Sequence, residues 1–217
     1  MNLATPTLLA ALALLGACSA KPVQPYSEPP LSVPTAQLRV ITNGEVRGDA
    51  YAGCLGDSKR LAKAGRFGSD QQANINYPQF PVQPRQIDML PRFAPKLPAY
   101  AGAIRRGEGA YNEIATEYRV PAGRPFLLEG GGVAAGGYGS TYSTCPEVRK
   151  VVLFEPGKSY EAYVGLNYIP QANGETAAMC AFAVYQLLPL GKPGAVMPMA
   201  VQALSLIHIS EPTRLLS

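Results

Sequence analysis

The sequence predicts an all-β protein: an antiparallel β-sandwich with one short helix and long proline-rich loops. Glycine and proline together supply 43 of the 217 residues (22 and 21), which favours turns and short strands over long helices. Short apolar segments, several of them alternating, are separated by Pro/Gly turns. No helical pattern alternates with them, as it would in a parallel α/β fold. The expected architecture is therefore a sandwich, either Ig-like or a small barrel.

The first elements lie between residues 38 and 64. Residues 38–42 (LRVIT) predict a strand, and Asn43-Gly44 predicts a tight hairpin turn because both residues tolerate positive φ. Residues 45–47 would begin the return strand. Residues 58–64 predict the short helix, with Asp57 as its N-cap and Gly65 just past its end. The nearby basic residues predict a solvated helix face, with a phosphate or lipid-headgroup patch as the alternative; they are Lys59, Arg60, Lys63 and Arg66.

The middle of the chain is rich in proline: residues 74–98 contain six prolines. Proline lacks the amide donor that a strand ladder needs, so this segment predicts a long surface excursion or an edge strand. The β signal then strengthens in five segments, 113–120, 124–129, 148–154, 159–166 and 179–188. The last of them (MCAFAVYQLL) is apolar enough to predict a strand that is buried on both faces.

Four cysteines are present. Cys145 lies just before one predicted strand and Cys180 within the last one, and we predict that they form a disulfide. Its loop of 35 residues would contribute about 3–4 kcal/mol in the chain-entropy treatment. Spacing alone allows three pairings among Cys54, Cys145 and Cys180. With the preferred pairing, Cys54 is left as a free thiol, an intermolecular bridge, or the partner of a cysteine beyond the present sequence.

Ligand-binding candidates are the two tyrosines that flank the glycine-rich loop, Tyr138 and Tyr142. Their rings could stack on sugars or peptides, with Tyr160, Tyr163 and Tyr168 adding to the surface, although tyrosine is equally common on half-buried sheets. Residues 130–135 match G-x-G-x-x-A, a variant of the dinucleotide fingerprint. The glycines that follow cannot start the helix that the fingerprint requires, so we predict a hairpin loop and no cofactor.

The sequence does not predict a catalytic or metal site. The only histidine, His208, falls in a C-terminal tail discussed below, which leaves no Ser-His-Asp triad, Cys-His pair or His-ligated zinc, and we predict no metal. Paired carboxylates could serve a glycan hydrolase, but no pair stands out. The net charge of +4 is modest and does not indicate a nucleic-acid partner.

The N-terminus resembles the signal of bacterial lipoproteins. Eight apolar residues, 8–15, are too few to span a bilayer and are followed by Gly16, Ala17 and Cys18. The motif Leu15-Gly16-Ala17-Cys18 resembles a lipobox, although residues 1–7 lack Lys and Arg. In that family the signal is cleaved before the cysteine, which is then acylated. Neutral Ser19 implies sorting to the inner leaflet of the outer membrane, facing the periplasm.

The C-terminal segment Leu204–Ser217 has a different origin in this interpretation. Residues 204–214 (LSLIHISEPTR) resemble a translated sequencing adaptor, so the tail is expected to be non-native read-through. The expected organisation is then a signal peptide over 1–17, a lipidated cysteine with a proline-rich spacer over 18–37, a single β-rich domain over 38–203 and the tail. Residues 19–37 would extend at most about 60 Å as a spacer.

The resemblance implies a protein of the bacterial envelope that is anchored to the membrane by Cys18. Together with the missing catalytic set, it leads us to expect a non-enzymatic β-sandwich that binds or scaffolds an envelope protein or peptidoglycan. The alternatives are a carboxylate-dependent glycan hydrolase and a glycan- or peptide-binding module that uses exposed tyrosines.

Overall fold

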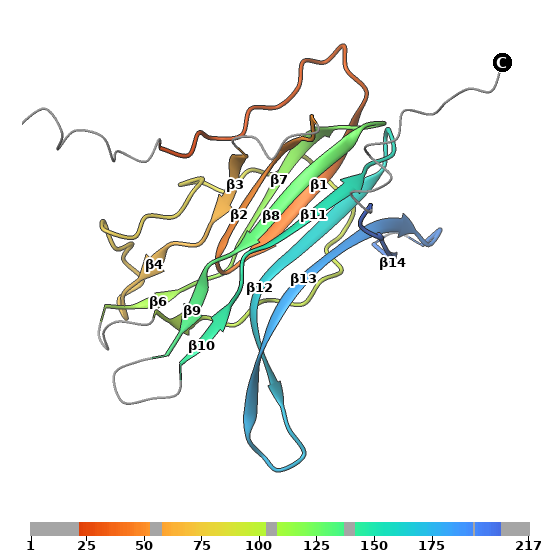
Figure 1. Ribbon diagram of the computed structural model, residues 1–217. Coiled ribbons are helices and arrows are strands. Elements are labelled where there is room, and N and C mark those ends of the chain that lie inside the picture. The colour runs from red at the N-terminus through yellow and green to blue at the C-terminus, as the bar shows by residue number, and fades with distance from the viewer. Residues whose placement is uncertain (1–21, 53–57, 103–107, 137–141, 193, 205–217) are drawn as a thin grey trace, which may run out of the picture.

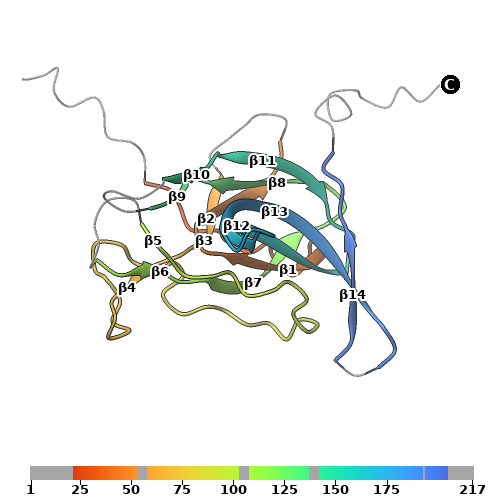
Figure 2. The same cartoon turned by 90° about the horizontal axis from the view of Figure 1, so that it is seen from below.

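The computed structural model describes residues 22–52, 58–102, 108–136, 142–192 and 194–204, and every regular element in these ranges is a β-strand. Two sheets of five and four strands face each other, and Figures 1 and 2 show them as two layers. This arrangement confirms the predicted all-β sandwich. Across these ranges there is no helix of the length and hydrophobicity needed to cross a membrane.

The five-stranded sheet has the order β14-β13-β12-β1-β7. Its strands are β1 (Thr35–Thr42), β7 (Ile114–Pro121), β12 (Ser159–Pro170), β13 (Thr176–Pro189) and β14 (Val196–Ala200). All pairs in it are antiparallel except β1 with β12, which run parallel from Gln37 opposite Ser159 to Thr42 opposite Val164. The first strand of the domain thus lies inside this sheet, between β12 and the edge strand β7.

The four-stranded sheet has the order β11-β8-β2-β3 and is antiparallel throughout. Its strands are β2 (Glu45–Ala50), β3 (Lys59–Lys63), β8 (Pro125–Gly131) and β11 (Val148–Leu153). The main core lies between the two sheets and is formed by alternate residues of both, including Leu38, Val40, Phe126 and Leu128, which are all fully buried. Inward-facing alternation of this kind is what the sequence pattern requires.

Two smaller sheets lie at one end of the sandwich. One has the order β4-β6-β5, from β4 (Arg66–Phe67), β5 (Tyr100–Ala101) and β6 (Ala110–Tyr111); the other pairs β9 (Val133–Ala135) with β10 (Ser143–Cys145). At the same end, β12 and β13 continue past the sheet as a long hairpin over residues 167–178, which we call the arm (Figure 1).

The segment predicted as a helix, residues 58–64, is instead strand β3. Leu61 and Ala62, which are consecutive, are both fully buried, and the strand pairs with β2 from Glu45 opposite Lys63 to Gly48 opposite Lys59. Backbone pairing with β2 makes this segment an edge strand of the sheet, and the folded chain covers both of these side chains. Tertiary contacts therefore override the local capping signals of Asp57, which lies outside the described residues, and Gly65.

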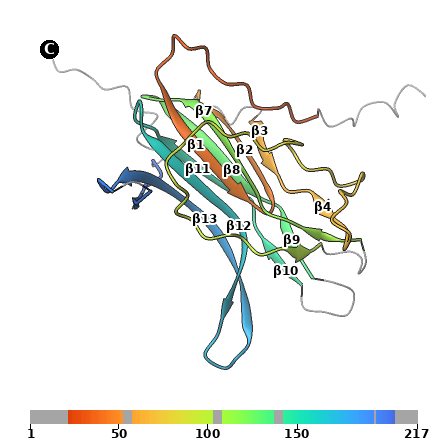
Figure 3. The same ribbon diagram turned by 180° about the vertical axis from the view of Figure 1, so that it is seen from behind.

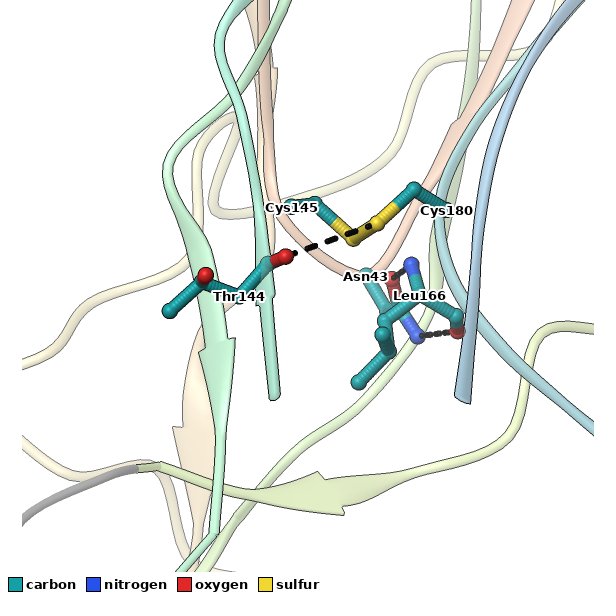
Figure 4. The surroundings of a disulfide bond; sticks show 5 residues. All are labelled: Asn43, Thr144, Cys145, Leu166 and Cys180. Carbon is teal, nitrogen blue, oxygen red and sulfur yellow. Dashed lines mark hydrogen bonds between the residues drawn. A yellow bond between two sulfur atoms is a disulfide. The ribbon is translucent and has the colours of Figure 1, made fainter. Parts of the chain in front are cut away.

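Asn43-Gly44 does not form a hairpin turn, because β1 and β2 belong to different sheets and the chain crosses between them here. The side chain of Asn43 is fully buried; its Nδ2 donates to the carbonyl oxygen of Leu166 (2.7 Å) and its Oδ1 accepts from the Leu166 amide (2.9 Å) (Figure 4). Gly44 is required by close approach, since a Cβ there would clash with the side chain of Val133.

The last predicted strand also differs from expectation. β13 begins at Thr176, and its residues 176–180 are exposed because they lie in the arm and at its base. Burial returns only at Val184, Gln186 and Leu187. The proline-rich residues 74–98 form a long loop over the outer face of the five-stranded sheet, as Figures 2 and 3 show. That loop was predicted as a surface excursion.

Candidate functional site

The predicted disulfide is present. Cys145, in β10, and Cys180, in β13, are bonded, with their Cα atoms 5.4 Å apart (Figure 4). The bond joins the small β9-β10 sheet to the base of the arm. It also lies against a small apolar pocket of about 60 Å³ between the two main sheets. The disulfide therefore fixes the end of the sandwich at which the small sheets and the arm meet.

A larger cleft, with a volume of about 580 Å³, lies at that end on the outer face of the four-stranded sheet. This volume falls within the range of small-molecule sites. The sheet supplies its floor, and the sheet β4-β6-β5 and the β8–β9 connection supply its walls. Charged groups, tyrosine rings and glycine backbone dominate the lining, which includes Glu45, Arg47, Lys63, Arg66, Tyr77, Tyr100, Tyr111, Glu129, Gly130, Gly131, Gly132, Tyr142 and Glu147.

Arg66 is the central residue of one wall. Its guanidinium packs against the rings of both Tyr77 and Tyr111, with Cζ 4.9 and 5.1 Å from their centroids, and Nη1 donates to Glu108 (2.6 Å). The residue is only 2% exposed, and its Nε has no hydrogen-bond partner among the described residues. Cation–π contact with two rings explains how an arginine is held in a site so poorly hydrated.

The rings of this wall continue the stack. Tyr100 lies parallel to Tyr111, with centroids 5.2 Å apart and planes at 20°. Burial raises the pKa of the Tyr111 hydroxyl, and the positive charge of Arg66 opposes that rise. Both phenols stay protonated at neutral pH, so they present neutral O–H groups at the wall. Tyr142 also lines the cleft and is 58% exposed.

The floor carries carboxylates that are paired with arginines. Glu45 accepts from Nε of Arg47 (2.8 Å) and from Nε of Arg60 (3.0 Å), and Glu129 is paired with Arg149 (2.5 Å) and accepts from the hydroxyl of Ser58. Burial alone would raise the pKa of Glu45, but its two arginine partners outweigh burial and lower it. Lys63, by contrast, makes no ion pair within the part of the chain that the structure describes.

Glycines form the rim between floor and wall. Gly131 (φ 148°) and Gly132 (φ 70°) turn the chain from β8 into β9, and a Cβ at Gly131 would clash with the backbone at Glu147. Residues 133–135 are strand β9, so no helix follows these glycines as the dinucleotide fingerprint would need. The glycines form a tight turn, and they are among the residues that line the cleft.

A second cluster of ionisable groups lies on the other sheet. Arg39 bridges two carboxylates, with Nε 2.8 Å from Glu117 and Nη1 2.6 Å from Glu161. Backbone amides of the proline-rich loop also donate hydrogen bonds to both carboxylates: Ile87 donates to Glu117 (2.7 Å) and Ala94 to Glu161 (2.9 Å). Glu117 and Glu161 are at most 1% exposed. This pair holds the loop onto the sheet and is closed to a substrate.

The sequence-predicted site residues are thus distributed unevenly. Tyr142 lines the cleft, and Cys145 and Cys180 are bonded beside it. Cys18, Cys54 and Tyr138 lie outside the described residues. The other tyrosines are elsewhere: Tyr160 is in the main core, Tyr163 is under the proline-rich loop, and Tyr168 packs in a small cluster with Tyr100.

Sequence reasoning did not find the wall built around Arg66, Tyr77, Tyr100 and Tyr111. Its strands are two residues long and carry no periodicity; the only available signal was the tyrosine content of the chain. Among the residues with described positions, no group of three or more His, Cys, Asp or Glu side chains is placed to hold a metal ion. Comparisons of the chain with protein-family models, curated proteins and solved structures gave no match.

Proposed function

We propose that the chain is a lipid-anchored protein of the bacterial envelope whose β-sandwich binds a polar saccharide, such as a peptidoglycan fragment, in the cleft without cleaving it. The observation that carries the binding role is the cleft itself, which is lined by the exposed Tyr142 together with Arg66 and three further tyrosines of the wall. Sugar rings present apolar C–H faces for stacking and hydroxyls for charged and phenolic groups. The anchor is supported by the Leu15-Gly16-Ala17-Cys18 motif.

The state of the carboxylates supports binding rather than hydrolysis. A glycosidase needs one carboxyl group with a raised pKa to protonate the leaving group. In the cleft, Glu45 is held by two arginines that lower its pKa, and Glu129 is paired with Arg149. The buried Glu117–Glu161 pair is enclosed by the proline-rich loop. A carboxylate-dependent hydrolase is the second candidate.

The binding role is tested by titrating soluble peptidoglycan fragments into the purified chain in a calorimeter. Tyr142→Ala should weaken binding at least tenfold, because it removes the exposed ring from the lining of the cleft. Phe93→Ala is the matched control: its ring is 43% exposed, but it lies on the other sheet against Tyr185 and should leave affinity unchanged. Equal affinities for all three proteins would contradict the proposal.

One further measurement separates the saccharide-binding protein from the hydrolase, and another tests the lipid anchor. New reducing ends that disappear when one Asp or Glu is neutralised would favour the hydrolase. Metabolic labelling with palmitate should be lost in Cys18→Ala; label that persists in this variant would contradict anchoring at Cys18.

A further inference from the structure

The segment expected to be a spacer is partly docked on the domain. Residues 22–34, which we call the strap, lie across one end of the sandwich, opposite the arm (Figures 1 and 3). Pro25 forms a parallel bridge with Arg60 of β3, the Tyr26 amide donates to the Arg60 carbonyl (2.9 Å), and the Arg60 amide donates to the Gln24 carbonyl (2.8 Å). The strap therefore extends the four-stranded sheet beyond β3.

Side chains fix the strap as firmly as its backbone does. The ring of Tyr26 packs edge-on against Tyr118 and Phe126, at centroid distances of 5.6 and 6.1 Å. Glu28 accepts from the Arg119 amide (2.9 Å) and guanidinium (2.8 Å) and pairs with Arg85 (2.7 Å). A segment that contributes a ring to the core and a carboxylate to two arginines is part of the folded domain.

The free tether is consequently short. Three residues lie between Cys18 and Pro22, and the four Cα–Cα steps that join these two residues reach only about 14 Å when fully extended. An undocked spacer to residue 37 would reach about 60 Å. If Cys18 carries the lipid, Pro22 and its neighbour β3 cannot leave the vicinity of the headgroups.

We propose that the lipid at Cys18 holds the strap end of the sandwich against the membrane surface, with the arm directed away from the bilayer. This inference rests on the anchor of the proposed function. The surface near Pro22 fits such a contact: Lys59, whose side chain is 36% exposed and pairs with Asp49, lies on β3 beside the strap. Basic side chains close to an anionic leaflet are attracted to its headgroups. The partner of this surface is lipid headgroups.

The test uses the lipidated full-length chain on phosphatidylethanolamine–phosphatidylglycerol vesicles that contain a nitroxide on a fraction of the headgroups. In a Cys54→Ser background, a fluorophore is attached at Lys59→Cys on β3 or at Asn173→Cys at the tip of the arm. Because the nitroxide quenches only at short range, we expect quenching at position 59 to exceed that at position 173 at least threefold. Equal quenching, or stronger quenching at 173, would overturn the orientation.

Two variants distinguish the possible failures. Insertion of 15 Gly/Ser residues after Ala20 should reduce quenching at position 59 to the level of position 173, because it restores a long tether while leaving the strap intact. Quenching at 59 that survives the insertion would show that the tether length does not set the orientation. If the wild-type chain, expressed in bacteria with residues 1–17, acquires no lipid and fails to float with vesicles, the anchor itself is overturned. A lipidated chain with equal quenching at the two positions refutes only the orientation.

Discussion

The ring of Tyr26 packs edge-on against the ring of Tyr118, with their centroids 5.6 Å apart and their planes at 80°. Tyr118, 7% exposed, belongs to the main core and donates its hydroxyl to the carbonyl oxygen of Leu61 (2.6 Å). The contact therefore joins the strap, β7 and β3, three segments far apart in the sequence. It makes the start of the described chain a part of the folding unit.

Tyr26→Ala should lower the free energy of unfolding by about 2–3 kcal/mol, somewhat less than a fully buried aromatic residue, because Tyr26 is only partly buried. The measurement is urea unfolding followed by circular dichroism. Gln24→Ala, two residues away and exposed, is the control and should change stability by less than about 0.5 kcal/mol. A Tyr26 variant as stable as this control would show that the strap is not part of the folded domain.

Arg39→Gln should be among the most destabilising single changes, at about 3–5 kcal/mol, because it leaves Glu117 and Glu161 as uncompensated buried charges. Lys59→Gln breaks an ion pair that is more than a third exposed and should cost less than about 1 kcal/mol. Both are measured by urea unfolding. A loss below about 1 kcal/mol in Arg39→Gln would mean that the loop does not depend on this cluster.

Cys145→Ala/Cys180→Ala should lower stability by about 3–4 kcal/mol, since the bond closes a 35-residue separation and restricts the unfolded chain. Thermal unfolding with and without reductant provides the comparison. Reductant should shift the midpoint of the wild-type chain and leave that of the double variant unchanged. A shift of similar size in the double variant would assign the redox sensitivity to another thiol.

Acid should weaken the fold through Glu28 and Glu45. Burial would raise the pKa of Glu28, but hydrogen bonds from Arg119 and the charge of Arg85 outweigh burial and hold the pKa below its ordinary value. The pKa of Glu45 is lowered in the same way by Arg47 and Arg60. A carboxylate whose pKa is lower in the folded state than in the unfolded state stabilises the fold. This stabilisation is fully present at pH values above the pKa of the unfolded state, and it is lost as the pH falls through the pKa of the folded state. Unfolding free energies measured from pH 6 to 3 should decline less steeply in Glu28→Gln than in wild type. Parallel slopes would contradict this assignment.

Alternation and turn chemistry were sufficient to predict the longer strands. β7 and β12 overlap segments in which apolar residues alternate, and β8 and β11 overlap short apolar segments that adjoin Pro/Gly turns. The errors arose where a short local signal competed with packing. Residues 58–64 carry the caps of a helix, but burial of both Leu61 and Ala62 at the sheet edge decides for a strand. Asn43-Gly44 has the composition of a hairpin turn, but the side-chain amide of Asn43 instead donates a hydrogen bond to the carbonyl oxygen of Leu166.

The candidate site was predictable only at its most conspicuous residues. Tyr142 and the disulfide follow from a ring beside a glycine loop and from the positions of two cysteines relative to predicted strands. Arg66 appeared in the sequence as one of several basic residues on a solvated helix face. Its burial depends on Tyr77 and Tyr111, which only the three-stranded sheet brings to it. Contacts of this kind have no sequence periodicity.

The position of β1 inside its sheet has a kinetic consequence. Its two neighbours are β7, which begins at Ile114, and β12, which begins at Ser159. During synthesis an apolar strand therefore stays without either sheet partner until about half of the polypeptide has been made, and the parallel pairing with β12 closes a large loop. Such long-range topologies fold slowly and are prone to aggregate on the way, so refolding yield should depend strongly on protein concentration.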